Sequence, residues 1–113
     1  MSCEYRFFLE DIQKACEKVE RFTKGMTQEH LFSNEERFDA VMRNLEIIGE
    51  AAKHIPDNVR QEYSEIEWRK ICGFRDVAIH EYFGLDKEVI WDIITQKIPD
   101  LTIKINGMLK RLK

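Results

Sequence analysis

Apolar residues recur at alternating steps of three and four along three long stretches of the chain, and this spacing constrains the fold more than any other feature. Steps of three or four return side chains to one face of an α-helix, so each stretch predicts a helix with a single apolar stripe. The stripes comprise Phe8, Ile12, Ala15, Val19, Phe22 and Met26; Phe38, Val41, Leu45, Ile48, Ala52 and Ile55; and Ile90, Ile94, Ile98, Leu101, Ile105, Met108 and Leu112. Because no stretch shows strand-like alternation, the sequence predicts an all-α fold.

Capping and breaking residues mark the ends of the first two helices. The first helix is expected over residues 4–24, ending near Gly25. The second is expected over 34–54, where Ser33 can cap exposed amides and Glu36 follows three residues later, as in a capping box.

The second half of the chain predicts two further long helices. The segment PDNVRQEYSEIEWRK suggests a short helix or turn, leading into a helix from Glu67 to about residue 82. Gly84 marks a break, Asp86 can cap the last helix, and Pro99 should kink or split it. Four main helices with one stripe each predict an up-and-down bundle of four to five helices, and 113 residues suit a single domain over 1–113.

Charge and hydropathy restrict the classes of function. The opening MSCEYRFFLEDIQKACEKVE is interrupted by charges every few residues, unlike a signal peptide or a membrane span, so we expect a cytoplasmic protein without a membrane partner. With 18 basic and 21 acidic residues the net charge is −3, so any binding of nucleic acid must come from a local basic cleft.

The cysteines and two of the histidines indicate no metal site. Cys3, Cys16 and Cys72 form no C-x-x-C pair and are odd in number, which favours reduced thiols, mostly in the core, over a disulfide framework or structural zinc. His30 and His54 fall in loop-like or helix-end surroundings without convergent partners, so we interpret both as surface histidines. No metal or cofactor is expected.

The polar face of the second helix carries charges of both signs. Arg43, Glu46, Glu50 and Lys53 share one sector, and two carboxylates at this spacing could bind a metal or act as an acid and base pair. Alternating signs opposite an apolar stripe favour a solvated face with weak ion pairs instead. Gly49 is unusual, because a mid-helix glycine costs about 1 kcal/mol relative to alanine. We expect it to let another helix approach closely.

The stretch FRDVAIHEYFG, residues 74 to 84, sets polar groups among apolar anchors. Asp76 and His80 are four residues apart, so the carboxylate can hold one imidazole nitrogen and raise the basicity of the ring, although such pairs also occur as plain surface contacts. Arg75 and His80 are five apart, about 140° around a helix, and do not share a face. To act on one group, the arginine must sweep round, the helix must end near His80, or a second copy of the chain must complete the site.

The pattern R-x-x-x-x-H-x-Y, formed by Arg75, His80 and Tyr82, resembles the signature of the HEPN superfamily. It is most similar to the HepT-like toxin branch, which occurs in bacteria and archaea beside a minimal nucleotidyltransferase antitoxin, MntA. The likeness covers nearly the whole chain, through LEDI (9–12), RNLEIIGEAAK (43–53), IEWRKICGFRDVAIHEYFGLD (66–86), VIWDII (89–94) and IPDL (98–101).

The resemblance implies a HEPN-like helical bundle that forms a two-fold homodimer and acts as a metal-independent endoribonuclease toxin of a type VII-like toxin–antitoxin system. A ribose 2′-hydroxyl would attack the adjacent phosphate of RNA, His80 would transfer the proton, and Arg75 would hold the phosphate. Asp76 would orient His80. Many relatives carry an uncharged polar residue at this position, and an acid there can weaken the local attraction for RNA.

The resemblance further implies that the MntA-like partner attaches AMP to Tyr82 and so neutralises the enzyme. The added phosphate would lie on the Arg75 stripe, where a substrate phosphate is needed. Without the family context, Tyr82 is an amphipathic residue at a helix end. A second interpretation, favoured by the acidic net charge, is a non-catalytic helical docking module for the nucleotidyltransferase.

Overall fold

The computed structural model describes residues 4–81 and 87–112, with His80 and Glu81 described by their backbone alone. These residues form α-helices and one π-helix, and no strand occurs among them. The elements are α1 (Tyr5–Thr23), α2 (Gln28–Ser33), α3 (Glu35–Lys53), α4 (Asp57–Glu62), α5 (Trp68–Cys72), α6 (Phe74–Glu81), α7 (Lys87–Asp92), the π-helix η1 (Ile93–Lys97) and α8 (Ile98–Arg111).

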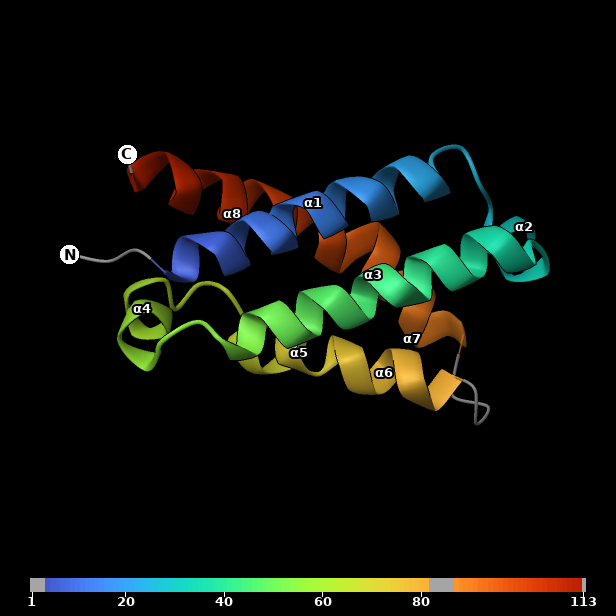
Figure 1. The fold of residues 1–113 in the computed structure, drawn as a ribbon. Coiled ribbons are helices and arrows are strands. Elements are labelled where there is room, and N and C mark those ends of the chain that lie inside the picture. Colours follow the sequence, from blue (N-terminus) through green and yellow to red (C-terminus); the bar gives the residue numbers. More distant parts are fainter. Residues whose placement is uncertain (1–3, 82–86, 113) are drawn as a thin grey trace.

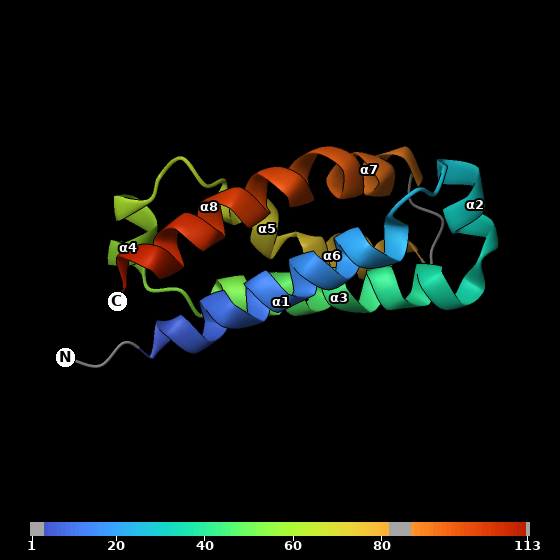
Figure 2. The ribbon, with the colours of Figure 1, turned by 90° about the horizontal axis from the view of Figure 1, so that it is seen from above.

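Helix α3 is the centre of an elongated bundle measuring 47 × 26 × 21 Å (Figure 1). It packs against α1 on one side and against α5 and α6 on the other, and α1 also packs against α8. Helices α1 and α3 run antiparallel, and α1 begins at the end of the bundle where α8 ends (Figures 1 and 2). The predicted all-α, up-and-down bundle is confirmed.

The predicted apolar stripes supply the core. Their fully buried members include Ile12, Val41, Leu45, Ile48 and Ile105, each with no exposed side-chain surface. Burying each such side chain contributes about 1.5–3 kcal/mol, so the stripes hold the helices together more than helix propensity does.

The start of α3 differs from the prediction, because a short helix precedes it. Thr27 caps α2, whose last residue is Ser33, and the Ser33 hydroxyl donates back to the carbonyl of His30. Asn34 therefore takes the capping role, and its Oδ1 accepts from the backbone N–H of Arg37 at 3.1 Å. The Ser33 cap was wrong; the helix bounds of 34–54 were right to within one residue.

The expected helix over residues 67–82 is divided. Gly73 separates α5 from α6 within the described residues, so Phe74–Glu81, the described part of the stretch FRDVAIHEYFG, forms a short helix of its own. The helix after residue 86 is also divided, since the π-helix η1 lies between α7 and α8 and Pro99 occupies the first turn of α8. A split near Pro99 was expected; Gly84 and Asp86 lie outside the described residues.

The cysteines that the structure describes are free thiols. Burial raises the pKa of the Cys16 thiol to about 12, whereas Cys72 is half-buried. Cys3 lies outside the described residues. Over the described part of the chain, none of the helices combines the length and apolar content needed to cross a bilayer.

Candidate functional site

Helix α6 carries the stretch that the sequence singled out, and Gly49 of α3 determines how closely α6 approaches. A Cβ atom at Gly49 would lie 2.7 Å from the backbone nitrogen of Arg75 and 3.0 Å from the carbonyl oxygen of Cys72. Such distances are too short for any side chain, so only glycine permits this backbone contact. The close approach predicted for Gly49 is confirmed, and the segment that approaches is the one bearing Arg75.

The guanidinium of Arg75 lies over the outer face of α3. Its Nε is 3.8 Å from Oε2 of Glu50, and the two side chains are 44% and 56% exposed. Both line a groove of about 400 Å³, here named the Arg75 groove, which runs from α1 across α3 to α6. Its lining residues are Phe8, Asp11, Arg43, Glu46, Ile47, Glu50, Ala51, His54 and Arg75.

The remaining walls of the Arg75 groove combine charge with an aromatic pair. Arg43 and Glu46 form an ion pair at 4.0 Å, as expected for a solvated helix face. Phe8 and His54 are stacked, with ring centroids 4.5 Å apart and planes 13° from parallel.

The sequence did not predict the partners of two residues in this groove. His54 is exposed but has a partner in Phe8 and lies in the same groove as Arg75, so it is not an isolated surface histidine. Glu50 was assigned to a solvated face with weak ion pairs, and this assignment is confirmed, since its side chain is 56% exposed; its partner at 3.8 Å is Arg75.

The other predicted residues are placed in part. His80 lies on α6 with Arg75, so the offset of about 140° between them holds along this helix. Asp76 is on the exposed side of α6. Tyr82 and the side chain of His80 lie outside what the structure describes. The anchoring residues behave as expected, since Phe74 and Ala78 are buried at 4% and 0% exposure.

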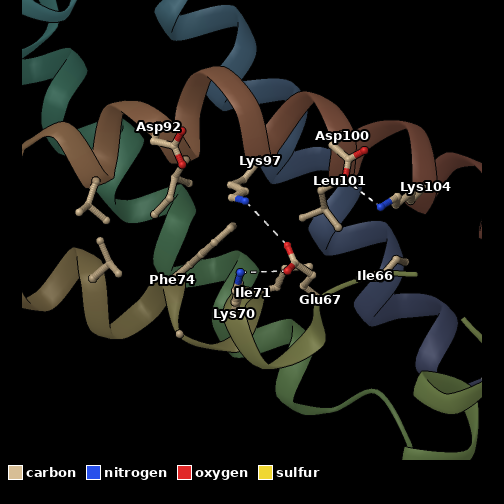
Figure 3. Close-up of a pocket in the computed structure, with 14 residues that line it drawn as sticks. Ile66, Glu67, Lys70, Ile71, Phe74, Asp92, Lys97, Asp100, Leu101 and Lys104 are labelled. Carbon is tan, nitrogen blue, oxygen red and sulfur yellow. Dashed lines mark ion pairs between the residues drawn. The ribbon is translucent and has the colours of Figure 1, made fainter. Parts of the chain in front are cut away.

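A second hollow, here named the apolar cavity, lies on another side of α6 (Figure 3). It measures about 260 Å³ between the α5–α6 segment and the η1–α8 segment, and Phe74, Val77, Ile93 and Leu101 are among its apolar walls. Since Arg75 lines the groove instead, the two hollows occupy different sides of one short helix.

Lysines and acids at the mouth of the apolar cavity are paired with one another. Glu67 accepts from Lys70 at 3.0 Å and faces Lys97 of η1 at 3.8 Å, and Lys104 pairs with Asp100 at 2.9 Å (Figure 3). The hydrogen bond and charge of Lys70 lower the pKa of Glu67, and Lys97 and Lys104 add to this effect. Because these cations already have carboxylate partners, the mouth is a poor receptor for an anion.

Among the residues whose side chains are described, no three of the His, Cys, Asp and Glu residues are grouped so that they could hold a metal ion. The polar groups that line the Arg75 groove are two guanidinium groups, three carboxylates and one imidazole. The two arginines can bind an anion such as phosphate, whereas the carboxylates oppose its approach.

Comparisons with known proteins agree with this arrangement. The family model for ribonuclease HepT-like proteins matches residues 12–108. A candidate RNase of Caldanaerobacter subterraneus subsp. tengcongensis is 38% identical over 96% of each chain. The "Probable ribonuclease HepT" of Thermococcus cleftensis is 39% identical over 97% of this chain and 100% of its own.

A candidate RNase of Methanocaldococcus jannaschii is 34% identical over 97% of this chain and 91% of its own. No solved structure shows a significant match. The family model and the relatives thus match nearly the whole of a chain that folds as a helical bundle and carries Arg75 and His80 on one helix. The chain belongs to the HepT-like ribonuclease family of the HEPN superfamily.

Proposed function

We propose that this protein is a metal-independent endoribonuclease whose reacting groups are Arg75 and His80. The observation that carries the proposal is the placement of Arg75. Its backbone is held against Gly49, its guanidinium faces an open groove, and His80 follows on the same helix of a HepT-like ribonuclease.

The proposed reaction is transesterification within the RNA. The 2′-oxygen of a ribose attacks the adjacent phosphorus, the bond to the 5′-oxygen of the next nucleotide breaks, and a 2′,3′-cyclic phosphate forms. His80, with an ordinary pKa of about 6.5, can remove the 2′ proton or protonate the leaving oxygen near neutral pH. Arg75 offsets the charge that builds on the phosphate. Asp76 orients the His80 ring.

A two-fold dimer is part of this proposal. On one copy of α6 the two groups are about 140° apart, so a single helix directs them to different places. Two copies of α6 that face each other across a shared cleft would bring Arg75 of one copy and His80 of the other to one phosphodiester. A two-fold axis would generate two such pairs.

Cleavage of an RNA substrate in excess chelator tests the proposal. Arg75→Ala and His80→Ala should each lower kcat about 10²- to 10⁴-fold. This is the usual contribution of a positioned acid, a positioned base or a hydrogen-bond donor to the phosphate. Arg69→Ala and His30→Ala, which remove the same side chains from exposed positions on α5 and α2, should retain wild-type rates. Equal cleavage by all four variants would remove Arg75 and His80 from the mechanism.

We further propose that a minimal nucleotidyltransferase of the MntA type neutralises the enzyme by adding AMP to Tyr82. The phenolic oxygen would attack the α-phosphorus of ATP, pyrophosphate would leave, and the phenolic proton would pass to solvent. Intact-mass measurement after incubation with this partner and ATP should show added AMP on the wild type and none on Tyr82→Phe. An equal mass gain on both proteins would assign the modification elsewhere.

A non-catalytic docking module is the competing function, and the excess of acids over bases favours it. It requires tight binding of the nucleotidyltransferase together with the absence of RNA turnover at every protein concentration. The same cleavage assay therefore separates the two functions.

A further inference from the structure

We propose that Glu50 is a positioning residue for Arg75: it holds the guanidinium at Nε and leaves the two terminal nitrogens for a phosphate of the RNA. This inference rests on the ribonuclease function proposed above. It gives a role to a carboxylate that would otherwise repel the substrate.

The contact with Glu50 involves one edge of the Arg75 guanidinium and leaves the terminal N–H donors for another partner. The guanidinium has five N–H donors in a planar fork, and phosphate is commonly bound by two parallel donors. Because Oε2 of Glu50 lies 3.8 Å from Nε, the carboxylate faces the inner edge of the fork. The outer edge, formed by the terminal nitrogens, stays available in the open groove.

The backbone makes this placement specific. Gly49 brings α3 within contact distance of the Arg75 backbone nitrogen, and Glu50 is the next residue of α3. The backbones of Glu50 and Arg75 are therefore both fixed by the contact between α3 and α6. The ion pair itself is exposed to water and weak, so its effect on the rate should be modest.

Glu46 supplies a matched control within the same groove. It lies one helical turn before Glu50 on α3 and also lines the Arg75 groove, but its partner is Arg43 at 4.0 Å. Replacing Glu46 with Gln removes one negative charge from the groove and leaves the contact at Arg75 intact. Any effect that arises from charge alone should appear in both glutamine variants.

The test measures kcat and KM for RNA cleavage by Glu50→Gln, Glu46→Gln and Glu50→Asp. We expect Glu50→Gln to lower kcat about two- to fivefold without raising KM, the effect of losing one exposed ion pair that orients a hydrogen-bond donor. Glu46→Gln, which removes the same charge from the groove, should lower kcat less than Glu50→Gln does. Glu50→Asp keeps the charge but shortens the reach by one methylene, so it should behave as Glu50→Gln does.

A double-variant comparison distinguishes positioning from a general structural effect. In an Arg75→Lys background, which removes the planar fork, Glu50→Gln should cause no further loss of kcat. An equal loss in both backgrounds would show that Glu50 acts independently of Arg75 and would overturn the inference.

The Nε–H resonance of Arg75 reports the contact without any assay of activity. Its ¹⁵N chemical shift should move in Glu50→Gln and remain in place in Glu46→Gln. A wild type that cleaves no RNA would refute the ribonuclease proposal itself. An active wild type for which Glu50→Gln matches Glu46→Gln in kcat would refute the positioning role alone.

Discussion

Helix α6 meets its two surroundings in opposite ways. Toward α3 the backbones are in contact at Gly49, with no room for a methyl group. Toward η1 an apolar cavity of about 260 Å³ separates the elements, and one ion pair, between Glu67 and Lys97, crosses its mouth. The tight contact involves the backbone of Arg75, whereas Phe74 and Val77 line the loose side. In this molecule the packing is therefore closest beside the residue that we propose binds the phosphate.

The largest effect is expected from adding a methyl group at the close contact between α3 and α6. Gly49→Ala should lower the free energy of unfolding by about 1–3 kcal/mol, because the new Cβ forces α6 away despite the better helix propensity of alanine. Denaturant unfolding measures the change. RNA cleavage should fall as well, since Arg75 moves with the backbone.

The matched control for that variant is Gly107→Ala. Gly107 lies inside α8, where an added Cβ meets no atom within 4 Å. The same substitution should therefore raise stability by about 0.5–1 kcal/mol through helix propensity. Equal effects at the two glycines would contradict the assignment of a close contact at Gly49.

A second prediction adds a methyl group on the loose side. Val77 lines the apolar cavity, so Val77→Ile should place one more methyl group in existing space and raise the free energy of unfolding by up to about 0.8 kcal/mol. Thermal or denaturant unfolding tests this, with Ile103→Val, a change of one methylene at a 74% exposed position, as the reference. A loss of stability in Val77→Ile would mean that the cavity is already filled or closed.

The smallest expected effect concerns the mouth of the cavity. Since Lys70 is the main cause of the lowered pKa of Glu67, Lys70→Ala should return that pKa toward its ordinary value of 4.5, and a carbon-detected NMR titration would follow it. Lys104→Ala should change the pKa of Glu67 less than Lys70→Ala does.

The sign of the effect of Glu67 on stability follows from the direction of its shift. A carboxyl group with a lowered pKa stabilises the folded state above its ordinary pKa, and this contribution disappears as the pH falls through the lowered value. The wild type should therefore lose the pairs of Glu67 on acidification below about pH 4.5, and Lys70→Ala should lose less. If the wild type and Lys70→Ala lost equal stability on acidification, Lys70 would not be the main cause of the lowered pKa of Glu67.

Much of the fold could be predicted because the core depends on helical periodicity. The stripes of α1, α3 and α8 were readable from spacing alone, and Gly49 marked a close helix contact. The cap of α3 was not, because Ser33 and Asn34 are both good capping residues and the choice depends on α2, a helix of six residues. Short helices have too little periodicity to recognise.

The candidate site could be predicted only along a single helix. The motif places Arg75 and His80 on α6, which the structure bears out. The contact of Arg75 with Glu50 joins residues 25 positions apart, and the stack of Phe8 on His54 joins the start of α1 to the end of α3. Such pairs depend on how helices pack, and local spacing holds no information about them.

The most direct test of the central claim is RNA cleavage by a mixture of two inactive variants. Arg75→Ala and His80→Ala are combined, exchanged into mixed dimers, and assayed in chelator. If Arg75 of one copy acts with His80 of its partner, each mixed dimer keeps one complete pair and the mixture should recover roughly a quarter of wild-type activity. A mixture as inactive as its components, with mixed dimers demonstrated by native mass spectrometry, would contradict the account.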